Sequence, residues 1–144
     1  VVQRDVDNGN TFQTFVYKYT TGEREYWVYT QSDQWRVVSS EDGTSGTQKL
    51  VATGSTEVPL VPTFIHTSCD GVNLEVTIDD EATDATACSG MYDGIQDMWL
   101  GNSSSSFRMD GSVSHLLRLG DDKLTAGQVA NVKDLLRRKW GITV

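Results

Sequence analysis

Basic residues and long apolar runs are scarce in this chain, and each shortage argues against a class of function. The 144 residues hold 12 Lys and Arg against 20 Asp and Glu, a formal net charge of −8. Nucleic-acid binding is disfavoured, because phosphate contacts require Lys and Arg. No apolar run reaches the ~18 residues of a membrane-spanning helix, so we expect no membrane span. The acidic surplus is typical of a soluble surface, although a cation-rich setting or bound calcium would also explain it.

Cysteine is nearly absent too. Cys69 and Cys88 lie 19 positions apart and form no metal-binding spacing. Two alternatives stay open for them, a disulfide in an oxidising compartment or a pair of buried thiols. The chain begins with Val1 and has no visible signal peptide, so we expect a processed product or a piece of a longer protein. Its length predicts a single domain over 1–144 with a sizeable core.

Alternating segments separated by turn residues predict an antiparallel β-protein. Asp70-Gly71 between two such segments is a strong hairpin signal. The returning strand has one apolar face, as expected when only that face meets the core: Val72, Leu74, Val76 and Ile78. We predict strands over 12–19, 25–30, 34–38, 49–52, 63–69, 72–78, 97–100 and 113–119, with loops over 1–10 and 79–87. Turn signals roughly every 8 to 12 residues predict a sandwich or barrel.

The residues after Thr125 predict one helix. Thr125 is an N-cap, and Gln128, three residues on, completes a capping box. Arg137, Arg138 and Lys139 suit the negative end of the helix dipole in the last turn. The helix has one apolar face, made of Val129, Val132, Leu135, Leu136 and Trp140. We expect this face to dock on the outer side of a sheet.

Motifs in the second half of the chain resemble a known superfamily. A glycine-led strand, an L-T helix start and a closing K-W-G lie at Gly111, Val113, Leu116, Leu124, Thr125 and Lys139-Trp140-Gly141. Upstream are the hairpin over 63–78 and the strand end Trp99-Leu100-Gly101. Together they resemble the laminin-G-like branch of the concanavalin A-like lectin/glucanase superfamily, in register over 63–142 and loosely over 11–38. The resemblance agrees with the strand pattern in implying an all-β, antiparallel two-sheet jelly-roll sandwich with one C-terminal α-helix.

Residues suited to catalysis do not stand out. Glucanases of this superfamily align paired carboxylates on one strand, so that acid and nucleophile both face the cleft. Here Glu75 and Asp79 flank Thr77 without a third carboxylate. No G-x-S-x-G elbow occurs, and His66 and His115 each lie inside a predicted strand. We therefore predict no catalytic site and no enzymatic activity.

Two acidic loops are candidates for calcium binding. Asp79, Asp80 and Asp84 supply carboxylates in one loop, and the other loop spans 5–9. Calcium takes several oxygen ligands from flexible loops. Laminin-G-like relatives bind calcium at the rim of the sandwich, so the resemblance favours the first loop. The alternative is that both loops are acidic surface turns.

Aromatic residues crowd the first forty positions and form the candidate ligand site. In the strand over 25–30, Trp27 and Tyr29 share one face and Tyr26 takes the other, so one set faces outward unless both faces are covered. Exposed aromatics on a sheet stack on sugar rings or receive a partner's apolar surface. Hydrogen-bonding side chains follow in the adjoining turn, at Gln31, Asp33 and Gln34. The alternative is that these rings belong to the core.

Two functions are consistent with these observations. The first is a non-catalytic module that binds a glycan or another surface ligand and is displayed on an extracellular or virion-type assembly. The acidic composition favours neutral sugars over anionic ones unless a cation bridges them. The second is a structural or decoration component of a viral particle or extracellular fibre, whose only partners are neighbouring proteins.

Overall fold

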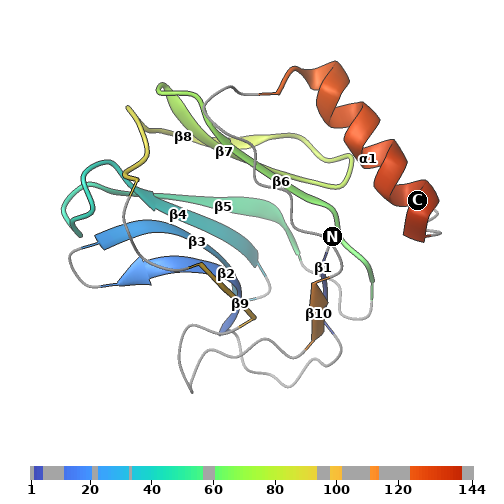
Figure 1. The fold of residues 1–144 in the computed structure, drawn as a ribbon, viewed down its shortest axis with the longest axis horizontal. Helices are drawn as coiled ribbons and strands as arrows, with labels where there is room; N and C mark the ends of the chain where they lie inside the picture. Colours follow the sequence, from blue (N-terminus) through green and yellow to red (C-terminus); the bar gives the residue numbers. More distant parts are fainter. Residues whose placement is uncertain are drawn as a thin grey trace.

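Two antiparallel sheets and one helix form the body of this protein, seen in a computed structural model (Figure 1). The structure describes residues 2–4, 12–20, 23–32, 34–56, 61–93, 98–101, 111–113 and 124–140. Its elements are β1 (Val2–Arg4), β2 (Phe12–Thr20), β3 (Glu23–Gln31), β4 (Gln34–Ser40), β5 (Gln48–Thr56), β6 (Ile65–Cys69), β7 (Asn73–Ile78), β8 (Asp84–Ala87), β9 (Trp99–Leu100), β10 (Gly111–Val113) and α1 (Ala126–Trp140).

The molecule is layered. One sheet has the strand order β5-β4-β3-β2-β9, the other has the order β6-β7-β8, and β1 pairs with β10 in a separate ladder. Figure 1 shows the three-stranded sheet lying between the five-stranded sheet and α1. The expectation of two antiparallel sheets followed by one C-terminal helix is confirmed.

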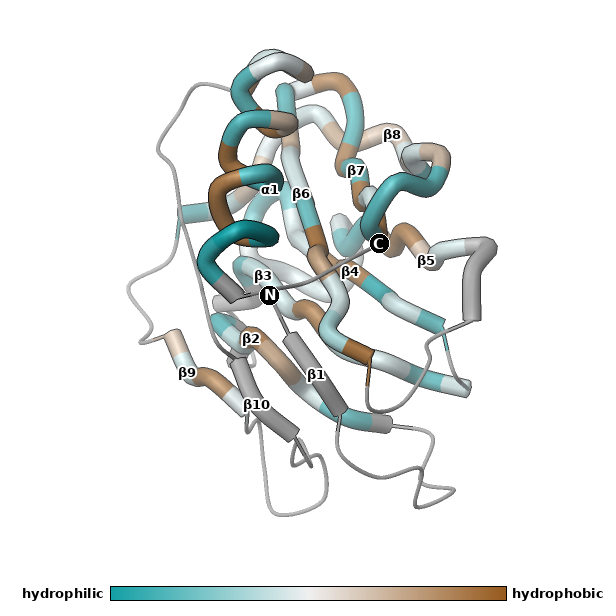
Figure 2. Tube along the Cα trace, turned by 90° about the vertical axis from the view of Figure 1, so that its right-hand side faces the viewer, coloured by the Kyte–Doolittle hydropathy of each residue, from teal (hydrophilic) through white to brown (hydrophobic). Residues whose placement is uncertain are grey.

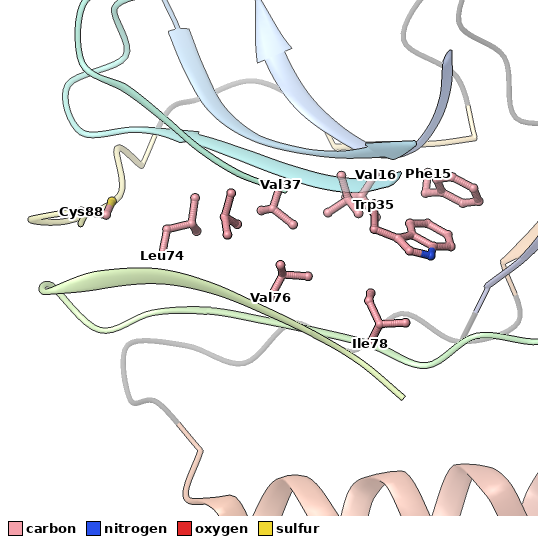
Figure 3. Packing of buried hydrophobic residues seen from close by; sticks show 10 residues of the cluster. Phe15, Val16, Trp35, Val37, Leu74, Val76, Ile78 and Cys88 are labelled. Carbon is pink, nitrogen blue, oxygen red and sulfur yellow. The ribbon is translucent and has the colours of Figure 1, made fainter. Parts of the chain in front are cut away.

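A hydrophobic core fills the space between the two sheets (Figure 3). At one end of it the rings of Phe15 and Trp35 lie 4.7 Å apart, and both are almost completely buried. Leu74, Val76 and Ile78 point into this core from β7, which confirms the predicted alternation at those positions. The prediction is wrong at Val72, which lies in the turn before β7 and is 67 % exposed.

Polar contacts accompany the core. The Tyr26 hydroxyl on β3 and the Thr67 hydroxyl on β6 share a hydrogen bond that joins the two sheets. Lys18 forms an ion pair with Glu25, and both side chains are buried. Asp93 lies 3.6 Å from the same ammonium group, at the edge of this buried pair.

Two β-bulges shape the central hairpin of the five-stranded sheet. Between the pairs Thr14↔Tyr29 and Val16↔Val28, β2 has one extra residue, Phe15. The bulge lets the consecutive residues Phe15 and Val16 both enter the core, which strict alternation forbids. A second bulge places one extra residue in β3, between Tyr19↔Arg24 and Lys18↔Tyr26.

Helix α1 begins at the predicted cap. The Gln128 backbone N–H donates to the Thr125 hydroxyl at 3.3 Å. The Thr125 backbone N–H donates to the Gln128 side-chain oxygen at 2.8 Å, so the capping box is confirmed. The predicted apolar face is wrong at Leu135, which is 62 % exposed, whereas Leu136 is buried. The least exposed stripe follows a helical spacing of the half-buried Val129 and Val132 and the buried Lys133 and Leu136, with Leu135 on its flank. The side chain of Trp140 is outside the described part of the chain.

The helix lies on the outer side of the three-stranded sheet, beside β6 (Figures 1 and 2). Lys133, which is 8 % exposed, donates to the Asp79 carbonyl oxygen and to the Asp80 carboxylate at 2.6 Å. Its ammonium group lies 5.6 Å from the centre of the Phe64 ring. Arg137 completes the attachment with an ion pair to Asp80 at 2.6 Å.

Two predicted loops contain strands, and the bounds of several predicted strands differ from those of the structure. Strand β1 falls within the predicted loop over 1–10, because it pairs with β10, a partner that local sequence cannot reveal. Strand β8 falls within the predicted loop over 79–87, because Asp84–Ala87 adds to the edge of β7 despite its small and acidic residues. Strand β5 is longer than the predicted 49–52. Of the strand predicted over 113–119, only its first residue is described, as part of β10.

Candidate functional site

The candidate site lies on the outer face of the five-stranded sheet, the face turned away from the core. Val28 points into the core, so its neighbours Trp27 and Tyr29 point to the outer face. Residues in register on neighbouring strands share a face. The register therefore draws two rows across this face, Trp99–Tyr17–Trp27–Val38–Leu50 and Thr14–Tyr29–Arg36–Ala52.

The first three members of the first row, Trp99, Tyr17 and Trp27, are called here the aromatic row. The Tyr17 ring meets the Trp27 ring edge-on, with centroids 5.5 Å apart and planes at 83°. Tyr29 lies against Trp27 at 4.4 Å and 34°. The Trp27 indole N–H donates to the Thr14 hydroxyl at 3.1 Å. These contacts hold the Trp27 ring in one orientation.

Exposure differs along the outer face. Trp99 is 58 % exposed on the edge strand β9, and Tyr17 and Trp27 are half-buried. Tyr29 is 6 % exposed, so it supports Trp27 and offers little surface of its own. The accessible aromatic surface therefore comes from the aromatic row.

The structure brings together most of the predicted ligand-binding residues. Trp27 and Tyr29 are in contact on β3, and Gln31 pairs in register with Gln34 at the end of the same face. Gln31 and Gln34 are both half-buried. Asp33, also predicted for this site, is outside the described residues.

Sequence reasoning missed two aromatic members of the site and one cation. Tyr17 was visible as a strand aromatic, but the Phe15 bulge that turns it outward was not. Trp99 was placed in a short predicted strand, and only the pairing of β9 with β2 sets it opposite Tyr17. Arg36 had no distinguishing sequence signal, since it follows a tryptophan and precedes two valines.

Arg36 has an unusual environment on this face. It lies opposite Tyr29 on β3 and opposite Ala52 on β5. Its Nε atom is buried and has no hydrogen-bond partner, and the guanidinium forms no ion pair within the described part of the chain. The residue as a whole is half-buried.

The carboxylates proposed for calcium are not gathered into one ligand set. The Asp79 carboxylate accepts the Phe64 backbone N–H at 2.9 Å. The Asp80 carboxylate is held by the two helix cations described above, which lower its pKa. Asp84 lies on β8, paired with Val76. Among the described residues no three acidic, histidine or cysteine side chains are grouped as metal ligands, and the loop over 5–9 is outside them.

The two cysteines lie together at the end of the three-stranded sheet. Both are free thiols, and their sulfur atoms are 3.6 Å apart. Burial raises the pKa of Cys69 above its ordinary value, with a further contribution from the Cys88 sulfur. Cys88 is buried, and its thiol donates to the Gly90 carbonyl oxygen at 2.9 Å. The raised pKa makes Cys69 less reactive than an ordinary thiol, and a disulfide between the two cysteines stays a prediction.

The segment after Cys88 ties the two sheets at this end. The Ser89 backbone N–H and hydroxyl both donate to Glu41 in the loop after β4, and these bonds lower the pKa of the Glu41 carboxyl. The Tyr92 N–H donates to the Ser40 carbonyl oxygen at 2.8 Å. The Tyr92 ring covers Gly43, whose φ of 85° and lack of room both favour glycine.

Two of the residues considered for catalysis, His66 and Glu75, lie on the neighbouring strands β6 and β7. His66 is half-buried on β6 and pairs in register with Thr77, while His115 is outside the described residues. Glu75 accepts a hydrogen bond from the Ser68 hydroxyl at 3.1 Å. Among the helices that the structure describes, none has the length and apolar character to cross a membrane.

Comparison with other proteins gives no relative. No protein family, curated protein or solved structure matches this chain. A functional assignment therefore has to come from the site.

Proposed function

We propose that this domain is a non-catalytic glycan-binding module whose ligand lies on the outer face of the five-stranded sheet. The observation that carries the proposal is the aromatic row, which crosses β9, β2 and β3 on the side away from the core. Neighbouring strands are about 4.8 Å apart, a spacing comparable to the length of one sugar unit. An oligosaccharide lying across the strands would meet one aromatic side chain at each of them.

Trp27 is the centre of the proposed site. Sugar rings stack on aromatic faces through their apolar C–H groups, and an aromatic contact contributes about 0.5–1.5 kcal/mol beyond area burial. Because Tyr17, Tyr29 and Thr14 already fix the indole, little side-chain freedom is lost on binding. Gln31 and Gln34 supply amide donors and acceptors for hydroxyl groups at one end of the face.

The finer features of the fold belong to the same proposal. We propose a concanavalin A-like jelly roll of the laminin-G-like branch, displayed on an extracellular or virion-type assembly. Its support is the arrangement of two antiparallel sheets around one core, followed by a C-terminal helix. Function is assigned here from the site, because one fold serves many functions.

One observation favours the second candidate, a structural component that binds only protein neighbours. Met98, Trp99 and Leu100 are 42 %, 58 % and 50 % exposed on and beside the edge strand β9, which is coloured as hydrophobic in Figure 2. Exposed apolar residues on a strand edge are a common contact for another chain. Concentration-dependent association in solution, abolished by Trp99→Lys, would favour this candidate.

A glycan array tests the proposed function. We expect the wild-type protein to bind a subset of oligosaccharides, Trp27→Ala to weaken that binding roughly 3- to 10-fold, and Trp27→Phe to retain most of it. Leu135→Ala is the control, because it removes an exposed apolar side chain on the far layer. Absence of binding by the wild type, or full binding by a folded Trp27→Ala variant, would contradict the proposal.

A further inference from the structure

Arg36 places a positive charge beside the aromatic row, on a part of the outer face whose other described residues carry no charge. It shares its row with Thr14, Tyr29 and Ala52, and none of these carries a charge. A guanidinium keeps its proton at any ordinary pH, so Arg36 stays positively charged even where it has no counterion. We propose that the outer face recognises an acidic sugar, and that Arg36 pairs with the carboxylate of a uronic acid or similar unit.

The Nε–H group of Arg36 lacks a hydrogen-bond partner. Buried N–H groups in proteins almost always have an acceptor, and those that do not call for an explanation. The buried Nε of Arg36 has none, and the guanidinium has no ion pair among the described residues. Because this Nε is buried, a ligand carboxylate would pair with the terminal N–H groups of the guanidinium and neutralise a charge that no described residue balances.

Arg36 is a diagonal neighbour of Trp27 on the outer face. Trp27 lies directly opposite Val38, and Arg36 is two residues from Val38 on the same strand and the same face. Such diagonal neighbours are about 7–8 Å apart, within reach of a long side chain. A pyranose ring stacked on Trp27 can therefore direct an exocyclic carboxylate toward Arg36.

The planar shape of the guanidinium favours a carboxylate as the bound anion. A guanidinium is a planar fork that bonds both oxygens of a carboxylate side by side. Gln34, two residues along β4 on the same face, adds an amide for a neighbouring hydroxyl. The net charge of −8 opposes long polyanions. The favoured ligand is therefore a short or mixed glycan with isolated uronic acid units.

This inference rests on the proposed glycan-binding function and reverses the preference for neutral sugars that the composition suggested. The probe is an array printed with matched oligosaccharides of glucose, galactose, mannose and xylose that carry one uronic acid. Each is present as the free acid and as its methyl ester, which keeps the ring and removes the charge. Sulfated oligosaccharides without carboxylates form a third set. Titration calorimetry then gives the affinity for the strongest free acid and its ester.

We expect the free acid to bind wild-type protein about tenfold or more tightly than the ester, the effect of one charge-assisted hydrogen-bonded contact. The ratio should fall to about one in Arg36→Gln and be partly kept in Arg36→Lys, which retains the charge without the fork. Arg138→Gln is the matched control, since it removes an exposed cation from the far side of α1. Thermal melting reports whether each variant folds.

The remaining outcomes separate the two proposals. Equal binding of acid and ester by the wild type would overturn the role of Arg36 and leave glycan binding intact. Binding of the sulfated set in place of the carboxylates, lost in Arg36→Gln, would overturn the carboxylate assignment. Binding to none of the three sets would overturn both proposals. Should Arg36→Gln not fold, the acid-to-ester ratio of the wild type decides alone.

Discussion

One outer face of the sandwich is covered by a helix, and the other exposes aromatic rings to solvent. The outer face of the three-stranded sheet is covered by α1, which charged contacts to Asp80 hold in place. The outer face of the five-stranded sheet presents the aromatic row, with Trp99 58 % exposed and Trp27 half-buried. One face is closed by residues that stabilise the fold, and the other keeps rings in reach of solvent. The first face therefore contributes to stability, and the second is the face to which we assign recognition in our proposal.

The largest effect should come from breaking the covered face. Leu136→Ala removes a buried side chain between α1 and the sheet, so we expect unfolding free energy to fall by about 2–5 kcal/mol. Leu135→Ala, one residue away and 62 % exposed, should change it by less than about 0.5 kcal/mol. Urea denaturation of both variants measures the difference. Equal losses would mean that the helix is docked in another orientation.

A disulfide between Cys69 and Cys88 should stabilise the three-stranded sheet further. Oxidation of Cys69 and Cys88 by a small-molecule disulfide forms a bond that closes a loop of about 20 residues, and we expect stabilisation of about 3 kcal/mol. Thermal melting before and after oxidation, with free-thiol titration, measures it. Cys69→Ser should show no gain under the same treatment. Complete oxidation without a rise in melting temperature would show that the bond distorts the sheet.

Acid should loosen the covered face selectively. Lys133 and Arg137 lower the pKa of Asp80 below its ordinary 3.8, so their contribution is present above that value and is lost as pH falls through the lowered pKa. We expect wild-type protein to lose more stability between pH 5 and pH 2 than Asp80→Asn does, by a smaller margin than either effect above. Circular dichroism during urea denaturation at each pH measures it.

A second carboxylate provides the control for this titration. Glu41 also has a lowered pKa, caused mainly by its bonds to Ser89, but it lies in the loop after β4, away from α1. Glu41→Gln should remove a different part of the acid dependence, and the double variant should lose both parts. An acid profile of Asp80→Asn identical to that of the wild type would contradict the role of Asp80.

The smallest effect on stability is expected on the open face. Trp99→Ala removes a ring that is 58 % exposed on a strand edge, so we expect a change within about 0.5 kcal/mol. The same variant should weaken glycan binding, which separates recognition from folding at this position. A loss as large as that of Leu136→Ala would place Trp99 in the folding core, and the contrast between the two faces would fail.

Local sequence patterns predicted those elements whose structure depends on neighbours in the chain. The Asp70-Gly71 hairpin, the inward face of β7 and the capping box at Thr125 each use contacts within a few residues. The patterns failed where a distant partner decides the structure. Strand β1 exists through β10, and β8 through β7, although neither segment has strong strand propensity.

Some residues of the candidate site were predicted from the sequence, and others were not. Trp27 and Tyr29 alternate visibly on one strand, and the two glutamines follow in the adjoining turn. Assembling Trp99 and Arg36 beside them required the order and register of four strands, information that no single segment contains. The Leu135 error arose because several apolar residues near the end of α1 allow more than one stripe, and only docking selects among them.

The two bulges in the β2–β3 hairpin have a consequence for how this protein tolerates insertions and deletions. Phe15 is the extra residue of β2 and Glu25 is the extra residue of β3, so both strands are 9 residues long and their ends meet, Phe12 opposite Gln31 and Thr20 opposite Glu23. Loss of the codon for either residue would leave every other pair of the hairpin in register, because a bulged residue has no partner on the opposite strand. Loss of Phe15 would instead remove a fully buried ring from the core, and loss of Glu25 would remove the buried partner of Lys18. The hairpin thus resists single-residue deletions at these two positions through what the extra residues bury, and the strand register itself does not impose the constraint.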